Sequence, residues 1–260
     1  MNILDQIIVD KKKEVALRKE LFPASYWEQS SLFEKPVISL SNRLKTSSSG
    51  IIAEHKRRSP SKSNINSNLS IFEVAQGYEN AGVCGMSVLT DLKYFGGALE
   101  DLVQARAVCT LPILRKEFII DEYQLIEAKA HGADVVLLIA AVLTREAIES
   151  LSFCAKQIDL EVLLEVHTQQ ELDKALMPSI DMIGVNNRDL KTFEVNIETS
   201  IEMASAIPSD FIKVSESGIS TLDSIKTLKG HGFQGFLVGE HFMKTNSPGA
   251  AAKQFIEGLQ

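Results

Sequence analysis

The chain has 260 residues, a length that suits either two small domains or one α/β barrel. Its 45% hydrophobic and 23% charged residues are typical of a globular protein, and a formal net charge of -7 argues against general nucleic-acid binding but not against an anionic small molecule. The three cysteines, Cys84, Cys109 and Cys154, form no CxxC pair, which argues against a disulfide framework or a zinc cluster and favours a reducing cytoplasm.

The N-terminal residues 3 to 20 have the spacing of an amphipathic helix. Its apolar face would collect Ile3, Ile7, Ile8, Val15 and Leu17. In "MNILDQIIVDKKK" the charges follow a short, interrupted apolar run, which is the reverse of the order in a secretory signal. The longest apolar run of the chain, "VVLLIAAVL", is far shorter than a membrane span. We therefore expect no membrane partner and a cytoplasmic location.

Short apolar runs recur along the chain after the serine-rich stretch "TSSSG". These runs predict eight strands: Ile51–Ala53, Met86–Leu89, Pro112–Leu114, Val135–Ile139, Glu161–Leu164, Met182–Val185, Phe211–Val214 and Gly235–Val238. The segments between them carry helix-start signals such as "TQQE". Eight strand–helix units favour an α/β fold, a (β/α)8 TIM barrel, over an open doubly wound sheet, and no GxGxxG follows the first strand. We expect one domain, with an N-terminal helical extension over residues 1–48 and the barrel over residues 49–260.

Polar residues stand at the ends of the predicted strands, where barrel enzymes carry their catalytic groups. They are Glu54 and Lys56 after strand 1, Lys116 after strand 3, Glu165 after strand 5, Asn186 after strand 6, Ser217 and Gly218 after strand 7, and Gly239 after strand 8. Glu54 and Lys56 should share one side of the sheet, whereas His55 should face the helices. A lone charged residue at a strand end is more often simply exposed to solvent. At "RKE", either neighbour of Lys116 could point into the barrel instead. The joint pattern predicts an active site, because independent accidents would scatter such residues to both ends of the barrel.

Small residues after strands 7 and 8 predict a phosphate site. In "SESGIST" and "VGEHFM", backbone N–H groups could approach an anion closely. This pattern indicates a phosphorylated substrate but no particular reaction. The loop "RRSPSK" after strand 1 could be a solvated basic loop, or it could equally cover the site and hold an anionic group. The histidines show no metal-binding spacing, so we expect no metal site.

Together these residues resemble the indole-3-glycerol phosphate synthase family of tryptophan biosynthesis. The similarity is carried by "IIAEHKRRSPSKS", "SVLTDLKYFGG", "LPILRKEFIIDEYQLIEAKAHGADVVLLI", "LLEVHTQQEL", "IGVNNRDLKTFEV", "VSESGI" and "FLVGEHFM", which follow the family's order from about residue 50 to about residue 245. The opening "ILDQIIVDKKKEVALRK" is similar to the family's N-terminal helix. "AE-x-K-x-x-SPS", "RKxF" and "GVNNRDL" are specific together, whereas "SESGI" also occurs in other phosphate-binding barrels.

The resemblance implies an enzyme, a carbon–carbon lyase of the carboxy-lyase type. Its substrate would be 1-(2-carboxyphenylamino)-1-deoxyribulose 5-phosphate. The indole ring would close with loss of carbon dioxide and water to give indole-3-glycerol phosphate. The implied reaction uses no cofactor and no metal, and the resemblance implies no nucleic acid, membrane or obligate protein partner.

The resemblance also implies site residues, by their positions in the matching stretches. The catalytic set would be Lys116, Glu165, Lys56, Glu54, Asn186 and Ser217. The substrate-binding set would be Lys56, Ser59, Phe95, Phe118, Arg188, Gly218, Gly239 and Glu240. Within it, Phe95 and Phe118 would lie against the anthranilate ring. Lys56 and the backbone of the two glycines and of Glu240 would hold the phosphate.

The chain departs from the family pattern at three positions. Ser63 stands where the common SPSKG has glycine, so the loop after strand 1 could take a different path. Glu117 replaces the aspartate of the usual RKDF. Glu240 stands where some relatives carry serine. Because its carboxylate would repel phosphate, we expect Glu240 to donate only its backbone N–H.

The implied chemistry needs an acid and a base. Lys116 is expected to be the general acid at the C2' carbonyl oxygen and Glu165 the base, with Lys56 or Glu54 assisting the dehydration. Which lysine serves which step stays open. One alternative is a sugar-phosphate isomerase on the same barrel, such as phosphoribosylanthranilate isomerase, although no Cys/Asp pair stands at the right strand ends. The other is a catalytically silent barrel that binds a phosphorylated metabolite, which would have no use for two lysine–carboxylate pairs.

Overall fold

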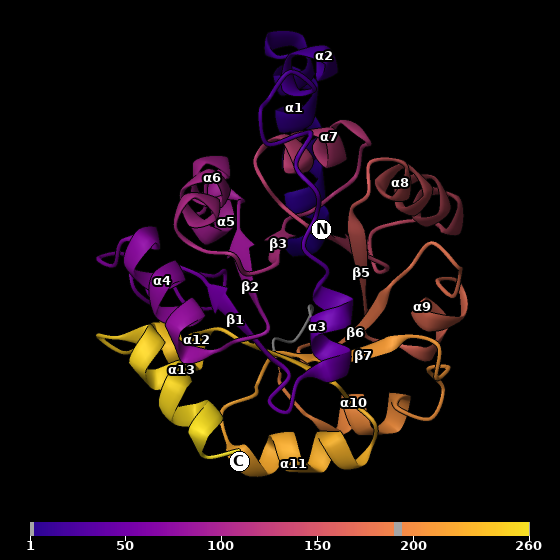
Figure 1. Ribbon diagram of the computed structural model, residues 1–260. Helices are drawn as coiled ribbons and strands as arrows, with labels where there is room; N and C mark the ends of the chain where they lie inside the picture. The colour runs from indigo at the N-terminus through magenta and orange to yellow at the C-terminus, as the bar shows by residue number, and fades with distance from the viewer. Residues whose placement is uncertain (1–2, 190–193, 260) are drawn as a thin grey trace.

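The computed structural model describes residues 3–189 and 194–259. Eight parallel strands form a closed barrel in chain order (Figure 1). They are β1 Ile51–His55, β2 Gly85–Leu89, β3 Ile113–Lys116, β4 Val135–Ile139, β5 Glu161–Val166, β6 Met182–Asn186, β7 Ile212–Glu216 and β8 Gly235–Val238. The predicted (β/α)8 TIM barrel is confirmed. Several strands run one or two residues further than the apolar runs that predicted them, because strand pairing continues into the polar residues at their C-terminal ends.

Helices surround the barrel and cover both of its ends. Those before β1 are α1 Ile3–Leu21, α2 Ala24–Trp27 and α3 Leu40–Thr46. The outer ring consists of α4 Ile71–Ala81, α6 Leu99–Val108, α7 Tyr123–Ala130, α8 Arg145–Gln157, α9 Gln169–Asp173, α10 Glu198–Met203, α11 Leu222–Gly230 and α13 Pro248–Glu257. Two single-turn helices follow β2 and β8: α5 Leu92–Phe95 and α12 Glu240–Met243. Over the described residues, no helix combines the length and the apolar character that crossing a membrane requires.

Strand alternation divides the core into two parts. Residues such as Ala53 and Val88 point outward and pack against the helices. Residues such as Ile52, Leu114 and Leu163 point into the barrel and form a separate inner cluster. The same alternation carries the next inward positions toward the C-terminal mouth, where the predicted polar residues stand.

The bottom of the barrel is closed by α3 and by a buried carboxylate. Leu40 and Leu44 of α3 join the inner cluster. Glu161, at the start of β5, accepts hydrogen bonds from the backbone N–H groups of Leu40 and Ser41 at 2.8 and 3.0 Å. It also accepts from the hydroxyls of Ser39 and Ser41 at 2.5 and 2.7 Å. A carboxylate at the first turn of a helix also interacts favourably with the helix dipole.

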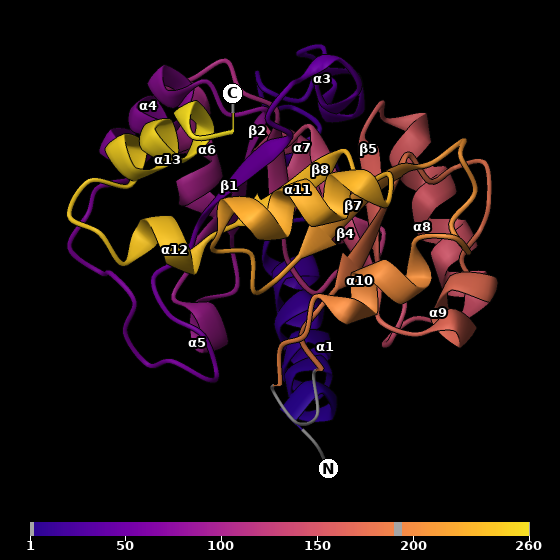
Figure 2. The same cartoon turned by 90° about the horizontal axis from the view of Figure 1, so that it is seen from below.

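Helix α1 lies at the opposite end, at the mouth of the barrel (Figure 2). The helix is confirmed, but its expected apolar face is only partly right. Ile7 and Val15 are buried, whereas Leu17 is 56% exposed and Lys11 is only 2% exposed. Ile7, Lys11 and Val15 are four residues apart and form one stripe, from which Leu17 points away.

Replacing Glu161 by alanine should lower the free energy of unfolding by about 3 kcal/mol, because it leaves buried N–H and hydroxyl donors without their charged acceptor. The measurement is the urea midpoint of unfolding. Glu149→Ala, at an exposed position on α8, is the matched control and should leave the midpoint within experimental error. A Glu161→Ala midpoint equal to that of the control would show that the carboxylate does not hold α3.

Candidate active site

A lysine–glutamate pair stands at the end of β1. Glu54 and Lys56 both line the cavity at the mouth, and Lys56 Nζ lies 2.6 Å from Glu54 Oε1. The residue after β8, Gly239, leaves room for this carboxylate, because a Cβ there would come within 2.4 Å of Glu54 Oε1. His55 faces the other way, as alternation predicts, and its buried Nε2 has no hydrogen-bond partner in the part of the chain that the structure describes. Burial, assisted by Arg57, lowers the pKa of His55 to about 4, so this imidazole is neutral at physiological pH.

Four charged side chains at the inward-facing ends of alternate strands form one layer, which we call the charged layer: Glu54 on β1, Lys116 on β3, Glu165 on β5 and Glu216 on β7. Barrel interiors are filled by such layers of four side chains from alternate strands. Lys116 Nζ donates to Glu165 Oε2 at 2.8 Å and to Glu216 Oε2 at 2.6 Å. Lys116 is therefore the inward-pointing member of "RKE", while Arg115 pairs with Glu127 on the outside at 2.7 Å.

The ionisable groups of the charged layer have different pKa values. Burial alone would lower the pKa of Lys116, but the attraction of Glu165 and Glu216 outweighs it and raises the pKa above its ordinary value. Burial also opposes ionisation of Glu165, yet Lys116 and Asn186 bring the pKa of Glu165 below its ordinary value. For Glu216, burial outweighs the attraction of Lys116 and raises the pKa to about 7. At neutral pH the layer thus holds a protonated lysine, an ionised glutamate and a glutamate that is close to half protonated.

Asn186 orients one of the two carboxylates. Its Nδ2 donates to Glu165 Oε1 at 2.9 Å, which leaves Glu165 Oε2 to accept from Lys116. Asn186 is held in turn, because its Oδ1 accepts from the backbone N–H of Arg188 at 3.0 Å and its carbonyl oxygen lies 2.7 Å from His167 Nδ1. The amide thus fixes the direction in which Glu165 presents its charge.

Glu216 is not among the residues predicted from the sequence. The predicted strand 7 ends at Val214 because the apolar run ends there, but the pairing of β7 continues to Glu216. Strict alternation from Ile212 through Val214 would have identified it as an inward-facing residue. Among the described residues its buried Oε1 has no hydrogen-bond partner, and a Cβ at Gly184 of β6 would come within 2.2 Å of that atom. Gly184 therefore makes the space that Glu216 occupies.

The turn after β7 has an uncommon backbone. Ser217 and Gly218 both have positive φ angles, 67° and 75°. This region is unfavourable for residues other than glycine, so Ser217 must be held there by its surroundings. Asn187 provides the restraint, because its Nδ2 donates to the carbonyl of Ser217 at 3.0 Å and to Ser215 Oγ at 2.9 Å. Asn187 is a second residue of "GVNNRDL" with a role that the sequence alone did not indicate.

The loop after β1 covers the cavity with its serines and turns its arginines away. Ser59, Pro60 and Ser61 line the cavity. Arg57 donates to Asp101 at 2.5 and 2.8 Å. The neighbouring Arg58 donates to backbone carbonyls of α5. The loop "RRSPSK" thus covers the cavity, while its arginines contact α5 and α6; that it holds an anionic group stays a prediction.

The carboxylate of Glu240 has a cationic partner. Lys62 Nζ lies 2.8 Å from Glu240 Oε1, and this hydrogen bond lowers the pKa of Glu240. The ion pair joins the loop after β1 to the N-terminus of α12. It also offsets the negative charge that would otherwise repel an anion at Gly239.

Two aromatic rings stand on the far side of the mouth from β7 and β8. Phe95 ends α5 after β2, and Phe118 follows β3; their ring centroids are 6.1 Å apart and their planes are inclined by 39°. We call the space that they line the aromatic slot. It opens into a cavity of about 420 Å³, a volume that suits a small-molecule ligand.

All the residues predicted for the site line this one cavity. They are Glu54, Lys56, Ser59, Phe95, Lys116, Phe118, Glu165, Asn186, Arg188, Ser217, Gly218, Gly239 and Glu240. Residues 190–193 of the "IGVNNRDLKTFEV" stretch lie outside the described residues. The cavity combines an aromatic slot, a charged layer beneath it and small-residue turns opposite the slot.

Solved structures share the barrel at low sequence identity. 3-Hexulose-6-phosphate synthase from Salmonella typhimurium matches with a TM-score of 0.63 at 16% identity, over 81% of this chain and 98% of that chain. The tryptophan synthase complex from Pyrococcus furiosus matches with a TM-score of 0.59 at 14% identity, over 81% and 97%. Likenesses at such low identity show the fold alone.

Sequence relatives are much more similar. An indole-3-glycerol phosphate synthase of Bacteroides thetaiotaomicron is 46% identical over 260 residues, which cover 100% of this chain and 99% of the relative. That of Albidiferax ferrireducens is 41% identical over 259 residues, which cover 98% of each. A family model described as indole-3-glycerol phosphate synthase matches residues 4–255. With this match over nearly its whole length, the chain belongs to the indole-3-glycerol phosphate synthase family.

Proposed function

We propose that this protein is an indole-3-glycerol phosphate synthase, which closes 1-(2-carboxyphenylamino)-1-deoxyribulose 5-phosphate to indole-3-glycerol phosphate with loss of carbon dioxide and water. Family membership supports the reaction. The observation that carries it is Lys116, a protonated and only 16% exposed lysine held between two carboxylates of different pKa at the base of a cavity with an aromatic slot. The three free cysteines are consistent with a cytoplasmic location.

The two ends of the substrate differ, and so do the two sides of the cavity. The phenyl ring fits the aromatic slot between Phe95 and Phe118. The phosphate fits the turns at Gly218 and Gly239, where backbone N–H groups can approach an anion closely, with Lys56 as a cation nearby. The reactive C2' carbonyl lies between the two ends of the substrate and would then face the charged layer.

Ring closure begins when C1 of the phenyl ring attacks the C2' carbonyl carbon. A new carbon–carbon bond forms, and the carbonyl oxygen takes a proton from Lys116 as its charge develops. The bond to the carboxylate then breaks, carbon dioxide leaves, and its electron pair restores the aromatic ring. Lys116 is suited to the acid role because its raised pKa keeps it protonated at neutral pH.

Dehydration needs further proton transfers. The hydroxyl must take a second proton to leave as water, while the new five-membered ring loses one proton to a base. Turnover therefore consumes one proton overall. Glu165, ionised at neutral pH and oriented by Asn186, is the base. Glu216, 2.6 Å from Lys116 Nζ, still carries its proton below about pH 7 and returns a proton to the lysine after ring closure.

Lys116→Ala should reduce turnover by about 10²- to 10⁴-fold, because it removes a positioned acid. The KM should change by less than about tenfold, since neither the slot nor the phosphate turns are altered. Indole fluorescence follows product formation, with Lys226→Ala, exposed on α11, as the control. Near-normal turnover of Lys116→Ala would remove Lys116 from the mechanism, and an inactive wild-type protein would overturn the proposed function.

The turnover of the wild-type enzyme should fall as the pH rises through about 7, because Glu216 then loses the proton that it returns to Lys116. Glu216→Gln should lower kcat by about 10²-fold and abolish this limb of the pH profile. The profile is measured at saturating substrate from pH 5.5 to 9, with Glu198→Gln on the exposed side of α10 as the control. A limb that persists in Glu216→Gln would assign the titration to another group.

A further inference from the structure

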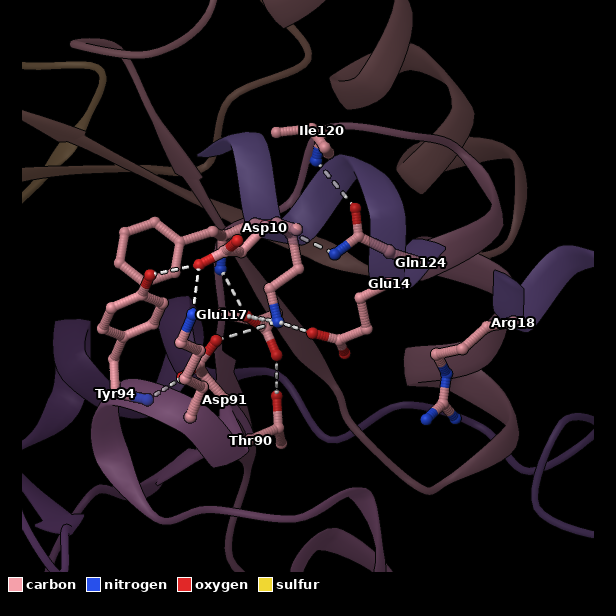
Figure 3. Close-up of polar contacts among 12 residues, drawn as sticks. Asp10, Glu14, Arg18, Thr90, Asp91, Tyr94, Glu117, Ile120 and Gln124 are labelled. Carbon is pink, nitrogen blue, oxygen red and sulfur yellow. Dashed lines mark hydrogen bonds and ion pairs between the residues drawn. The ribbon is translucent and has the colours of Figure 1, made fainter. Parts of the chain in front are cut away.

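A second buried lysine stands on α1, outside the charged layer. Lys11 is 2% exposed, and its Nζ lies 2.9 Å from Asp91 Oδ2, 3.1 Å from Glu117 Oε1 and 2.8 Å from Glu14 Oε2. Figure 3 shows Glu14, Asp91 and Glu117 converging on one point. Asp91 and Glu117 are themselves almost completely buried, whereas Glu14 is about half exposed.

The two buried carboxylates also hold the backbone of the aromatic slot. Asp91 caps α5, since its Oδ1 accepts from the N–H of Tyr94 at 2.6 Å, one residue before Phe95. Glu117 Oε1 accepts from the N–H of Phe118 at 2.8 Å. A backbone N–H at or next to each ring of the slot thus donates to a carboxylate that also contacts Lys11.

Glu117 makes a further contact that joins the loops after β2 and β3. Its Oε2 accepts from the hydroxyl of Thr90, which directly precedes Asp91 in the loop after β2, at 2.8 Å. The segments after β2 and β3, which carry Phe95 and Phe118, are therefore joined through the Lys11 ammonium and the Thr90 hydroxyl. Glu117 is also the position where this chain departs from the common aspartate, and its carboxylate reaches Lys11, Thr90 and the N–H of Phe118 together.

Charge makes this contact sensitive to the loss of Lys11. Burial would lower the pKa of Lys11, but the attraction of Glu117 and Asp91 raises it above the ordinary value, so the lysine stays charged. Arg115 lies 3.9 Å from Glu117 Oε2 but 2.7 Å from Glu127 Oε2, so it mainly compensates Glu127. Without the Lys11 ammonium, the buried carboxylates of Asp91 and Glu117 would therefore face each other with no cation between them, and like charges in a buried site repel strongly. The loops after β2 and β3 would then move apart.

Helix α1 carries the Lys11 ammonium and also forms part of the cavity wall. Ile3, Leu4 and Ile7 line the cavity. On the same helix, Asp10 accepts from Lys93 Nζ at 2.6 Å and from the Tyr94 hydroxyl at 2.5 Å, both on α5. A change at Lys11 would therefore act on the slot side of the cavity and leave the turns after β7 and β8 in place.

We propose that Lys11 is a positioning residue that sets the separation of Phe95 and Phe118, and thereby the affinity of the site for the aromatic end of its substrate. The proposal rests on the proposed function for the identity of that substrate. Lys11 touches neither the substrate nor the reacting atoms. It acts through Asp91 and Glu117, which hold the two loops.

The test compares ligands for the two ends of the cavity in Lys11→Met, which keeps the length of the side chain and removes its charge. The KM of the substrate should rise about tenfold while kcat changes by less than about threefold. Anthranilate, titrated calorimetrically as a probe of the slot, should bind about tenfold more weakly, and inhibition by inorganic phosphate should be unchanged. Lys19→Met, on the same helix in an exposed pair with Asp121, is the control and should behave like the wild type.

A double variant tests whether weaker anthranilate binding by Lys11→Met comes from repulsion between the two carboxylates or from a general loss of structure. Lys11→Met combined with Glu117→Gln leaves one buried carboxylate in place of two and should recover at least part of the anthranilate affinity. Asp91→Asn, which keeps Lys11, serves if Lys11→Met does not fold, and should weaken anthranilate binding while leaving phosphate inhibition unchanged. Wild-type anthranilate affinity in folded Lys11→Met, or an equal loss of phosphate inhibition, would overturn the proposal. Because the calorimetric anthranilate titration does not require turnover, it still tests the role of Lys11 if the wild-type protein is inactive and the proposed function fails.

Discussion

The mouth of the barrel depends on one ammonium group, that of Lys116, which shares the charged layer with the carboxylates of Glu54, Glu165 and Glu216. Lys116 can stay charged in this largely enclosed position only because Glu165 and Glu216 accept from it, and those carboxylates tolerate burial only because Lys116 lies between them. Since one lysine cannot fully compensate two carboxylates, Glu216 titrates near neutrality. A barrel that filled this layer with apolar side chains would be better packed, but it would have no group able to exchange a proton at the pH of the cell.

Three successive charged residues, the last two of β3 and the first of the loop after it, have partners in three different parts of the fold. Arg115 pairs outward with Glu127 of α7, Lys116 points into the charged layer, and Glu117 reaches Lys11 of α1. The alternation of a strand makes this possible, because neighbouring side chains leave on opposite sides. The two neighbours of Lys116 are thus anchored by buried ion pairs, which restricts the directions that the Lys116 side chain can take.

Periodicity predicted the fold well because a closed barrel repeats one simple pattern eight times. Strand ends predicted eight of the site residues: Glu54, Lys56, Lys116, Glu165, Asn186, Ser217, Gly218 and Gly239. They did not settle which residue of "RKE" points inward, and the family resemblance supplied Ser59, Phe95, Phe118, Arg188 and Glu240. What the sequence left open were contacts between distant segments. Glu216 was overlooked because the apolar run ends at Val214, and Lys11 reads as part of a solvated basic stretch, "DKKKE", until Asp91 and Glu117 are brought to it from residues far along the chain. Alternation places Glu216 inward, but no periodic signal in a single sequence indicates which distant residues pair with Glu216 or Lys11.

The closure of the bottom by Glu161 has a consequence for how the protein can change. Strand β5 begins with the carboxylate that fastens α3 and ends with the proposed base, Glu165, so one strand serves stability at one end and chemistry at the other. The strained Ser217 and the incompletely paired Glu216 stand at the mouth, and at the other end Asp159, two residues before β5, also has a positive φ of 63°. Substitutions that tighten the α3 end could therefore raise thermal tolerance without the loss of activity that usually accompanies stabilisation, which makes that end the natural starting point for engineering a more robust enzyme.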